Sequence, residues 1–108
     1  MSWDTYLVID TGGEELAEVA DLGNYTYNVA PMYYDVFGNL GLRLLDGLLA
    51  KNAIPILKIA INELESNPSK YRAMEPENEW GNYEGAVRYL KVILRGCMKH
   101  PKATIHIC

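Results

Sequence analysis

Cysteine is scarce in this sequence. Cys97 and Cys108 are the only two among 108 residues, and a chain of this length can bury a core without cross-links or a metal. No apolar run approaches the ~18 residues that a membrane span needs. The opening MSWDTYLVID has neither the basic region nor the cleavage site of a signal peptide. We therefore expect one compact domain, residues 1–108, with reduced thiols, a cytoplasmic location and no membrane partner.

Lysine and arginine are absent from the first 42 residues, where seven acidic side chains stand. The rest of the chain holds all ten basic residues and seven acidic ones, so the net charge of −4 combines an acidic first part with a mildly basic second part. Binding to nucleic acid depends on neutralising phosphates with cations. The acidic balance therefore argues against nucleic acid as a partner.

The motifs of catalysis and metal binding are also missing. There is no Gly-rich phosphate loop, no nucleophile elbow and no pair of histidines at helical spacing. Glu75, Glu77 and Glu79 alternate in a Pro-containing loop, but they do not follow the ligand order of a calcium loop. Cys97 and His100 have a ligand-compatible spacing without a second pair, and we interpret them as a core thiol and a helix-end cation. The sequence predicts no catalytic residue, metal site or cofactor.

Strand signals stand near both ends of the chain. The segment from Trp3 to Asp10 is rich in β-branched and aromatic residues and stops at TGG, which is typical of a strand followed by a turn. Residues 14–22 fit either a helix or a second strand, and the Gly-Gly turn favours a hairpin. Residues 24–29 alternate in polarity, which indicates extended chain. The closing ATIHIC predicts a final strand, which we expect to pair with the first.

Three helices are expected between these strands, and the first two are less clearly marked than the last. Pro31 favours a helix start and Gly38 a stop, which predicts one short helix. Apolar residues at helical spacing predict a central helix over residues 49–65. Because Pro55 is tolerated only near a first turn, this helix should start around Asn52 or carry a kink at the proline.

The last helix gives the clearest pattern. Asn82 is a good N-cap, Pro101 closes the segment, and the residues between them carry an apolar stripe over residues 86–98 that includes Met98. The expected fold class is α+β: a small antiparallel sheet, built from an N-terminal strand or hairpin and a C-terminal strand, packed against two main amphipathic helices and one short helix.

Basic side chains form a stripe on the other face of the last helix. Arg88, Lys91, Arg95 and Lys99 recur at spacings of three and four residues. Such a stripe can meet an acidic partner, or it can be a solvated face on which Glu84 pairs with Arg88 one turn away. We favour the solvated face.

Tyrosine is in surplus, at eight of 108 residues, and many of the rings stand beside amides in irregular segments. Tyr and Trp are enriched at interface hot spots and can also sandwich a planar ligand. The competing interpretation places the rings in the core and the amides in turns and caps. The candidate contact residues are Asn24, Tyr25, Asn28, Tyr33, Tyr34, Trp80 and Tyr83.

Two segments together resemble small bacteriophage-encoded proteins of unknown function. Asn24 to Thr26 and Asn28 to Met32 supply Asn-Tyr-Thr and Asn-Val-x-Pro-Met, and Pro76 to Tyr83 supplies Pro-Glu-Asn-x-Trp-Gly-x-Tyr. The resemblance covers about residues 22–98 and implies no activity. It implies a context, in which small phage proteins often act by binding a host protein such as a defence factor.

The leading hypothesis for function is a non-enzymatic binding protein that, in the phage context implied by the resemblance, modulates or inhibits a host protein. The alternative is a protein that binds or sequesters a small, nucleotide-like ligand in an aromatic pocket, which a homodimer interface could complete. A small hydrolase or transferase is the least favoured class, because no catalytic motif supports it.

Overall fold

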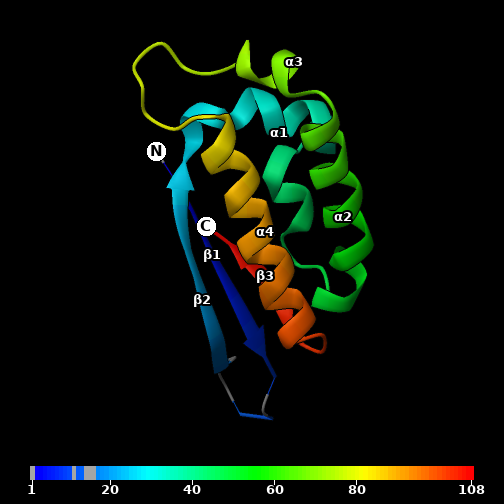
Figure 1. The fold of residues 1–108 in the computed structure, drawn as a ribbon. Coiled ribbons are helices and arrows are strands. Elements are labelled where there is room, and N and C mark those ends of the chain that lie inside the picture. The colour runs from blue at the N-terminus through cyan, green and yellow to red at the C-terminus, as the bar shows by residue number, and fades with distance from the viewer. Residues whose placement is uncertain (1, 11, 14–16) are drawn as a thin grey trace.

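The computed structural model describes residues 2–10, 12–13 and 17–108. It has the expected α+β class, with a three-stranded sheet and helices on one face of it (Figure 1). None of the helices in these ranges combines the length and the apolarity needed to cross a membrane. In chain order the elements are β1 (Ser2–Ile9), β2 (Ala17–Thr26), the 3-10 helix η1 (Tyr27–Val29), α1 (Ala30–Phe37), the 3-10 helix η2 (Gly41–Leu45), α2 (Ala50–Ser66), α3 (Pro68–Arg72), α4 (Tyr83–Lys99) and β3 (Thr104–Ile107).

The sheet has the order β2-β1-β3, and β1 is antiparallel to both neighbours. This confirms the predicted pairing of the two ends of the chain. It also confirms the hairpin for residues 17–22, whereas residues 14–16 of that prediction lie outside the described ranges. Alternate residues of β1, namely Trp3, Thr5 and Leu7, are buried against the helices, as period-2 geometry requires.

The prediction of extended chain over residues 24–29 is correct only as far as Thr26. Residues 27–29 form η1 instead, because the Thr26 hydroxyl accepts a hydrogen bond from the backbone N–H of Asn28 at 3.3 Å and starts a turn. As a result Val29 is buried, while Tyr27 lies against the Trp3 ring with the two ring centroids 4.8 Å apart.

The two first helices differ in how well the sequence predicted them. The short helix is confirmed as α1, which ends at Gly38, a residue with φ of +90°. The central helix predicted over residues 49–65 is confirmed as α2. It starts at Ala50, so Pro55 lies in its second turn, and of the two alternatives offered for the proline the start near Asn52 is wrong. The early start is possible because the N–H groups of Ala50 and Lys51 donate to the carbonyl oxygens of Ala103 and Pro101, at 2.7 and 3.0 Å.

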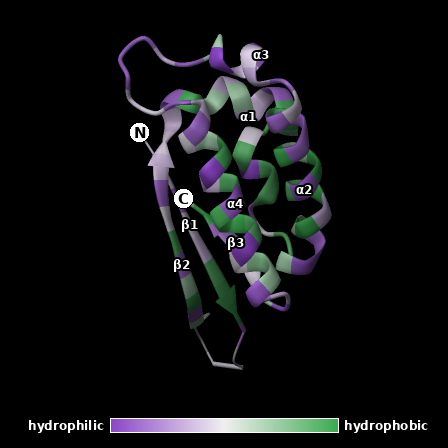
Figure 2. Ribbon diagram, viewed as in Figure 1, coloured by the Kyte–Doolittle hydropathy of each residue, from purple (hydrophilic) through white to green (hydrophobic). Residues whose placement is uncertain are grey.

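Helix α4 packs on the sheet and on α2, and its apolar side faces inward (Figures 1 and 2). The Asn82 cap is confirmed, because its side-chain oxygen accepts from the N–H of Gly85 at 2.7 Å. Met98 is 55% exposed, so its place in the predicted buried stripe is wrong. A Cβ on Gly96 would stand 2.7 Å from Leu22, which shows how closely the helix backbone approaches β2.

Candidate functional site

Two of the seven candidate contact residues lie in the interior. Tyr33 is 0% exposed and its hydroxyl donates to the carbonyl oxygen of Ala86 at 2.8 Å. Tyr83 is also buried, and its hydroxyl donates to the carbonyl oxygen of Leu64 at 2.7 Å. Both rings therefore fill the core and join helices to one another, and the surface proposed below does not include them.

Tyr25 is half-buried and links β2 to the start of α4. Its hydroxyl accepts a hydrogen bond from the N–H of Asn82 at 3.1 Å and lies 3.4 Å from the Asn82 carbonyl oxygen. A Cβ on Gly85 would stand 1.9 Å from that hydroxyl, so only glycine leaves room for the phenol there. Tyr25 thus has a positioning role, because it fixes the residue that caps α4.

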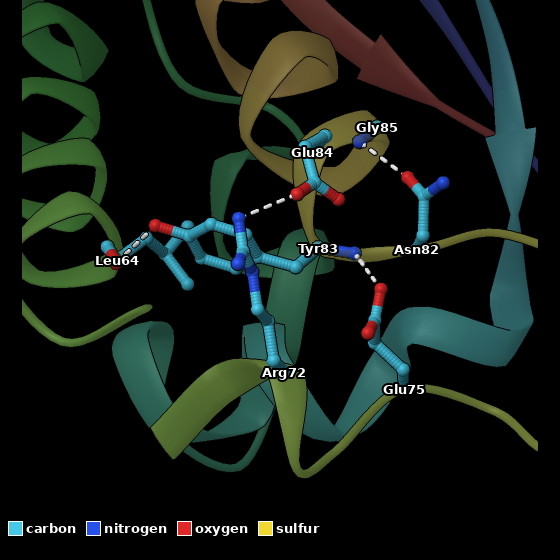
Figure 3. A network of polar contacts seen from close by, with 7 residues as sticks. All are labelled: Leu64, Arg72, Glu75, Asn82, Tyr83, Glu84 and Gly85. Carbon is cyan, nitrogen blue, oxygen red and sulfur yellow. Dashed lines mark hydrogen bonds and ion pairs between the residues drawn. The ribbon is translucent and has the colours of Figure 1, made fainter. Parts of the chain in front are cut away.

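The segment over residues 73–82, called here the 73–82 loop, is tied down where it joins α4 (Figure 3). A Glu75 carboxylate oxygen accepts from the N–H of Tyr83 at 2.9 Å. The Arg72 guanidinium, just before the loop, pairs with Glu84 at 2.6 Å and lies over the Tyr83 ring. The Glu75 carboxylate therefore helps to hold the first residue of α4 in place.

Among the described residues no three His, Cys, Asp or Glu side chains gather as a metal site would require.

The amides and the tryptophan come together where the 73–82 loop lies against the end of β2. Trp80 is 70% exposed and stands over a shallow depression of about 320 Å³. We call this the amide–tryptophan surface; its residues are Ser2, Asn24, Thr26, Asn28 and Trp80. Three of the predicted contact residues are thus neighbours in space, although more than fifty positions separate Trp80 from the two asparagines in the sequence.

The hydrogen-bonding capacity of this surface is only partly used. The Asn28 amide donates to the Thr26 hydroxyl at 3.1 Å. The Asn24 side chain is exposed and makes no hydrogen bond within the described residues. An amide offers two donor hydrogens and an acceptor oxygen, so Asn24 and Asn28 retain groups that can pair with another molecule.

The backbone of the loop holds Trp80 in this place. The Asn78 side chain accepts from the N–H of Trp80 at 3.0 Å, and Glu79 has a φ of 62°, an uncommon value for a residue other than glycine. Gly81 has a φ of +90°, and a Cβ there would stand 2.4 Å from the Thr26 methyl group. Gly81 therefore lets the loop backbone lie directly on the end of β2.

Tyr34 belongs to a second hollow on the same end of the fold. It is 43% exposed, and its hydroxyl forms a 2.7 Å hydrogen bond with that of Tyr27. The cavity beside this pair has a volume of about 170 Å³. We call it the aromatic pocket; its lining is Trp3, Tyr27, Ala30, Tyr34, Asn39, Leu40, Gly41, Leu42 and Arg43. Sequence reasoning missed Trp3, Tyr27 and Arg43, because nothing local indicates that these segments meet.

Three of the four basic residues on α4 border a groove. Arg88, Lys91 and Arg95 line it together with Glu65 of α2, which pairs with Lys91 at 3.0 Å. The expected pair between Glu84 and Arg88 is not formed among the described residues, because Glu84 turns to Arg72 instead. The interpretation of this stripe as a solvated face therefore needs one change, because Lys91 forms an ion pair with Glu65 of α2.

The thiols give no sign of a reactive centre. Burial raises the pKa of Cys97 to about 11, so this cysteine is a protonated core residue at neutral pH. Cys108 is exposed.

His106 on β3 has one carboxylate near it among the described residues, that of Asp46, at 4.0 Å.

No family model matches the chain, and no curated protein or solved structure shows significant similarity to it. The resemblance to phage proteins therefore stays a prediction. The proposals below therefore depend on two of the features just described, the amide–tryptophan surface and the aromatic pocket.

Proposed function

We propose that the protein acts by binding another protein through the amide–tryptophan surface. The observation that carries this proposal is the placement of Trp80, which is 70% exposed in a loop that hydrogen bonds and Gly81 hold against the end of β2. A large ring that stays in water forgoes the stabilisation that burial would bring, roughly 2–3 kcal/mol for a large apolar side chain. Covering Trp80 with a partner recovers that stabilisation.

The groups around the ring suit a protein partner. Tryptophan is among the residues that most often dominate interface energetics, especially when polar groups surround it. Asn24, Thr26 and Asn28 supply amide and hydroxyl groups at the rim, and these can pair with backbone N–H and C=O groups of an approaching chain. We expect the partner to present an apolar recess for the indole and exposed backbone groups beside it. The resemblance to phage proteins would make that partner a host protein.

Trp80→Ala tests this proposal. We expect the wild-type chain, used as bait, to retain a discrete protein from host lysate, and the purified pair to bind with an affinity that the substitution lowers by about thirtyfold, the usual effect at a hot spot. Ile59→Ala is the matched control, because Ile59 is an exposed apolar residue on α2, at 72% against 70% for Trp80. Both variants should keep the wild-type circular dichroism.

Two results would contradict the proposal. One is a partner that binds Trp80→Ala as tightly as wild type, which would place the contact elsewhere on the molecule. The other is equal loss of affinity in Trp80→Ala and Ile59→Ala, which would indicate a general effect on the fold. Asn24→Ala sharpens the test, since Asn24 makes no hydrogen bond within the described residues and its loss should weaken binding without changing stability.

A further inference from the structure

The aromatic pocket is a formed hollow, with walls that come from four elements. Trp3 of β1 is only 2% exposed and forms part of the inner wall with Leu42 of η2. Tyr27 of η1 and Tyr34 of α1 line it as well. Gly41 has a φ of +57°, which L side chains rarely adopt, and a Cβ there would stand 3.1 Å from the Tyr34 ring, so glycine favours this close approach of η2. Residues far apart in the sequence thus hold the shape of the pocket.

The size of the pocket limits what it can hold. Its volume of about 170 Å³ is below the roughly 300–1,000 Å³ typical of sites for drug-sized ligands and cofactors. A cavity of about 150 Å³ can take up benzene. The pocket therefore suits one six-membered ring, with the exposed rings of Tyr27 and Tyr34 to make offset or tilted aromatic contacts and the buried Trp3 ring packed against Tyr27.

The polar groups in the lining indicate the charge of the ligand. Arg43 is the one charged residue that lines the pocket, and none of the ion pairs among the described residues involves it. Between Tyr27 and Tyr34 one hydroxyl donates to the other, which leaves a single O–H proton of the pair free. The hydrogen bond to Tyr27 raises the pKa of Tyr34, so this phenol is protonated at neutral pH. Asn39 adds an amide.

We propose that the aromatic pocket binds a small aromatic carboxylate, with the ring between the aromatic side chains and the carboxylate on Arg43. A guanidinium matches a carboxylate with two parallel hydrogen bonds, and the free phenol O–H can donate to the same group. This inference is independent of the protein partner proposed above. It specifies the small-ligand alternative, with a single-ring anion as the ligand.

The test uses Trp3 as the reporter. In a Trp80→Phe background Trp3 is the only tryptophan of the chain, and its indole lies in the pocket wall. Benzoate, benzamide and acetate are the probes, because they separate ring plus charge, ring alone and charge alone. We expect benzoate to change the Trp3 fluorescence and the indole N–H resonance saturably, benzamide to bind on the order of tenfold more weakly, and acetate to have no effect.

Arg43→Gln in the same background separates the two interactions. We expect it to lower the affinity for benzoate to that for benzamide and to leave benzamide unchanged. Arg88→Gln is the matched control, since Arg88 is an exposed arginine that does not line the pocket, and it should bind benzoate like the parent. Circular dichroism checks the fold of each variant.

Three outcomes would overturn the proposal: no saturable response to benzoate, a response to benzoate no stronger than to acetate, or an affinity for benzoate that Arg43→Gln leaves unchanged. The Trp80→Phe background keeps this test apart from the partner proposal. Loss of partner binding on changing Trp80 does not alter the aromatic pocket, and failure of benzoate to bind does not alter the amide–tryptophan surface.

Discussion

Two groups of aromatic residues differ in what their polar atoms contact. One group is the tyrosines packed among the helices, and the other is the tyrosines at the end of the sheet where β1 starts. Tyr33 and Tyr83 donate to backbone carbonyl oxygens, and Tyr89 shares a 2.6 Å hydrogen bond with Thr5, all in the interior. At the sheet end, Tyr27 and Tyr34 bond only to each other's hydroxyls within the described residues.

This difference separates structural rings from available ones. A phenol can be buried only if its hydroxyl finds a partner, because an unpaired buried hydroxyl costs about 1–3 kcal/mol. The interior supplies a partner to each buried tyrosine, and no buried side-chain oxygen or nitrogen in the described residues lacks one. At the sheet end Tyr27, Tyr34 and Trp80 are exposed, so they are the rings there that can contact another molecule.

The largest expected effect comes from removing a ring on each side of this comparison. Tyr33→Ala leaves a large cavity and removes the hydrogen bond to the Ala86 carbonyl oxygen, and we expect it to lower the free energy of unfolding by about 3–5 kcal/mol. Trp80→Ala should change it by no more than about 0.5 kcal/mol, since the indole is mostly in water. Urea unfolding measures both. Similar losses of unfolding free energy in the two variants would contradict the distinction between structural and available rings.

A smaller effect is expected from a single buried hydroxyl. Tyr89→Phe leaves the Thr5 hydroxyl, which is 0% exposed, without its 2.6 Å partner, at a cost of about 1–3 kcal/mol. Adding Thr5→Val should recover much of this loss, because both halves of the pair are then apolar. Tyr27→Phe, which alters the solvent-facing pair, is the control and should cost less. A double variant with a lower free energy of unfolding than Tyr89→Phe would contradict this account.

Alkaline titration should separate the same two groups. Burial raises the pKa of Tyr89 from the ordinary 10.0 to about 12, and burial also raises the pKa of Tyr33. Because the folded state holds these protons more tightly than the unfolded state, their contribution to stability is complete below pH 10 and declines as the pH rises toward 12. We expect tyrosinate absorbance to show a late phase that coincides with unfolding, and Tyr89→Phe to lose less stability over this range than wild type. A late phase without unfolding would show that these rings are accessible.

The sequence could predict the elements with a strong local signal. The Asn82 cap, the period of α4 and the pairing of β1 with the next strand depend on neighbours in the chain, and the structure has all three. The short pieces η1, η2 and α3 were not predicted, because one or two turns carry too little periodicity. Their positions are set by packing against other elements.

The fate of each tyrosine could not be predicted from local pattern. Tyr33 and Tyr34 are adjacent, yet one is 0% and the other 43% exposed, because successive residues of a helix point about 100° apart. Helix α1 has only eight residues, several of them apolar, so the sequence does not indicate which side meets the core. Likewise Trp80 meets Asn24 and Asn28 only because Gly81 lets the loop lie on β2. The Gly beside Trp80 was visible in the sequence, but its tertiary contact was not.

The smallest expected effect concerns the ion pair at the base of the 73–82 loop. Sequence spacing pairs Glu84 with Arg88, whereas in the structure Glu84 contacts Arg72 at 2.6 Å (Figure 3). Both side chains of that pair are more than half exposed, at 54% and 58%, so we expect a coupling energy of about 0.2–1 kcal/mol that decreases with salt. A double-mutant cycle with Glu84→Gln and Arg72→Gln measures it by urea unfolding. The parallel cycle with Arg88→Gln should give no coupling. Coupling to Arg88 instead would mean that the start of α4 follows its local sequence, and that the Tyr25, Glu75 and Gly81 contacts hold the loop carrying Trp80 without help from Arg72.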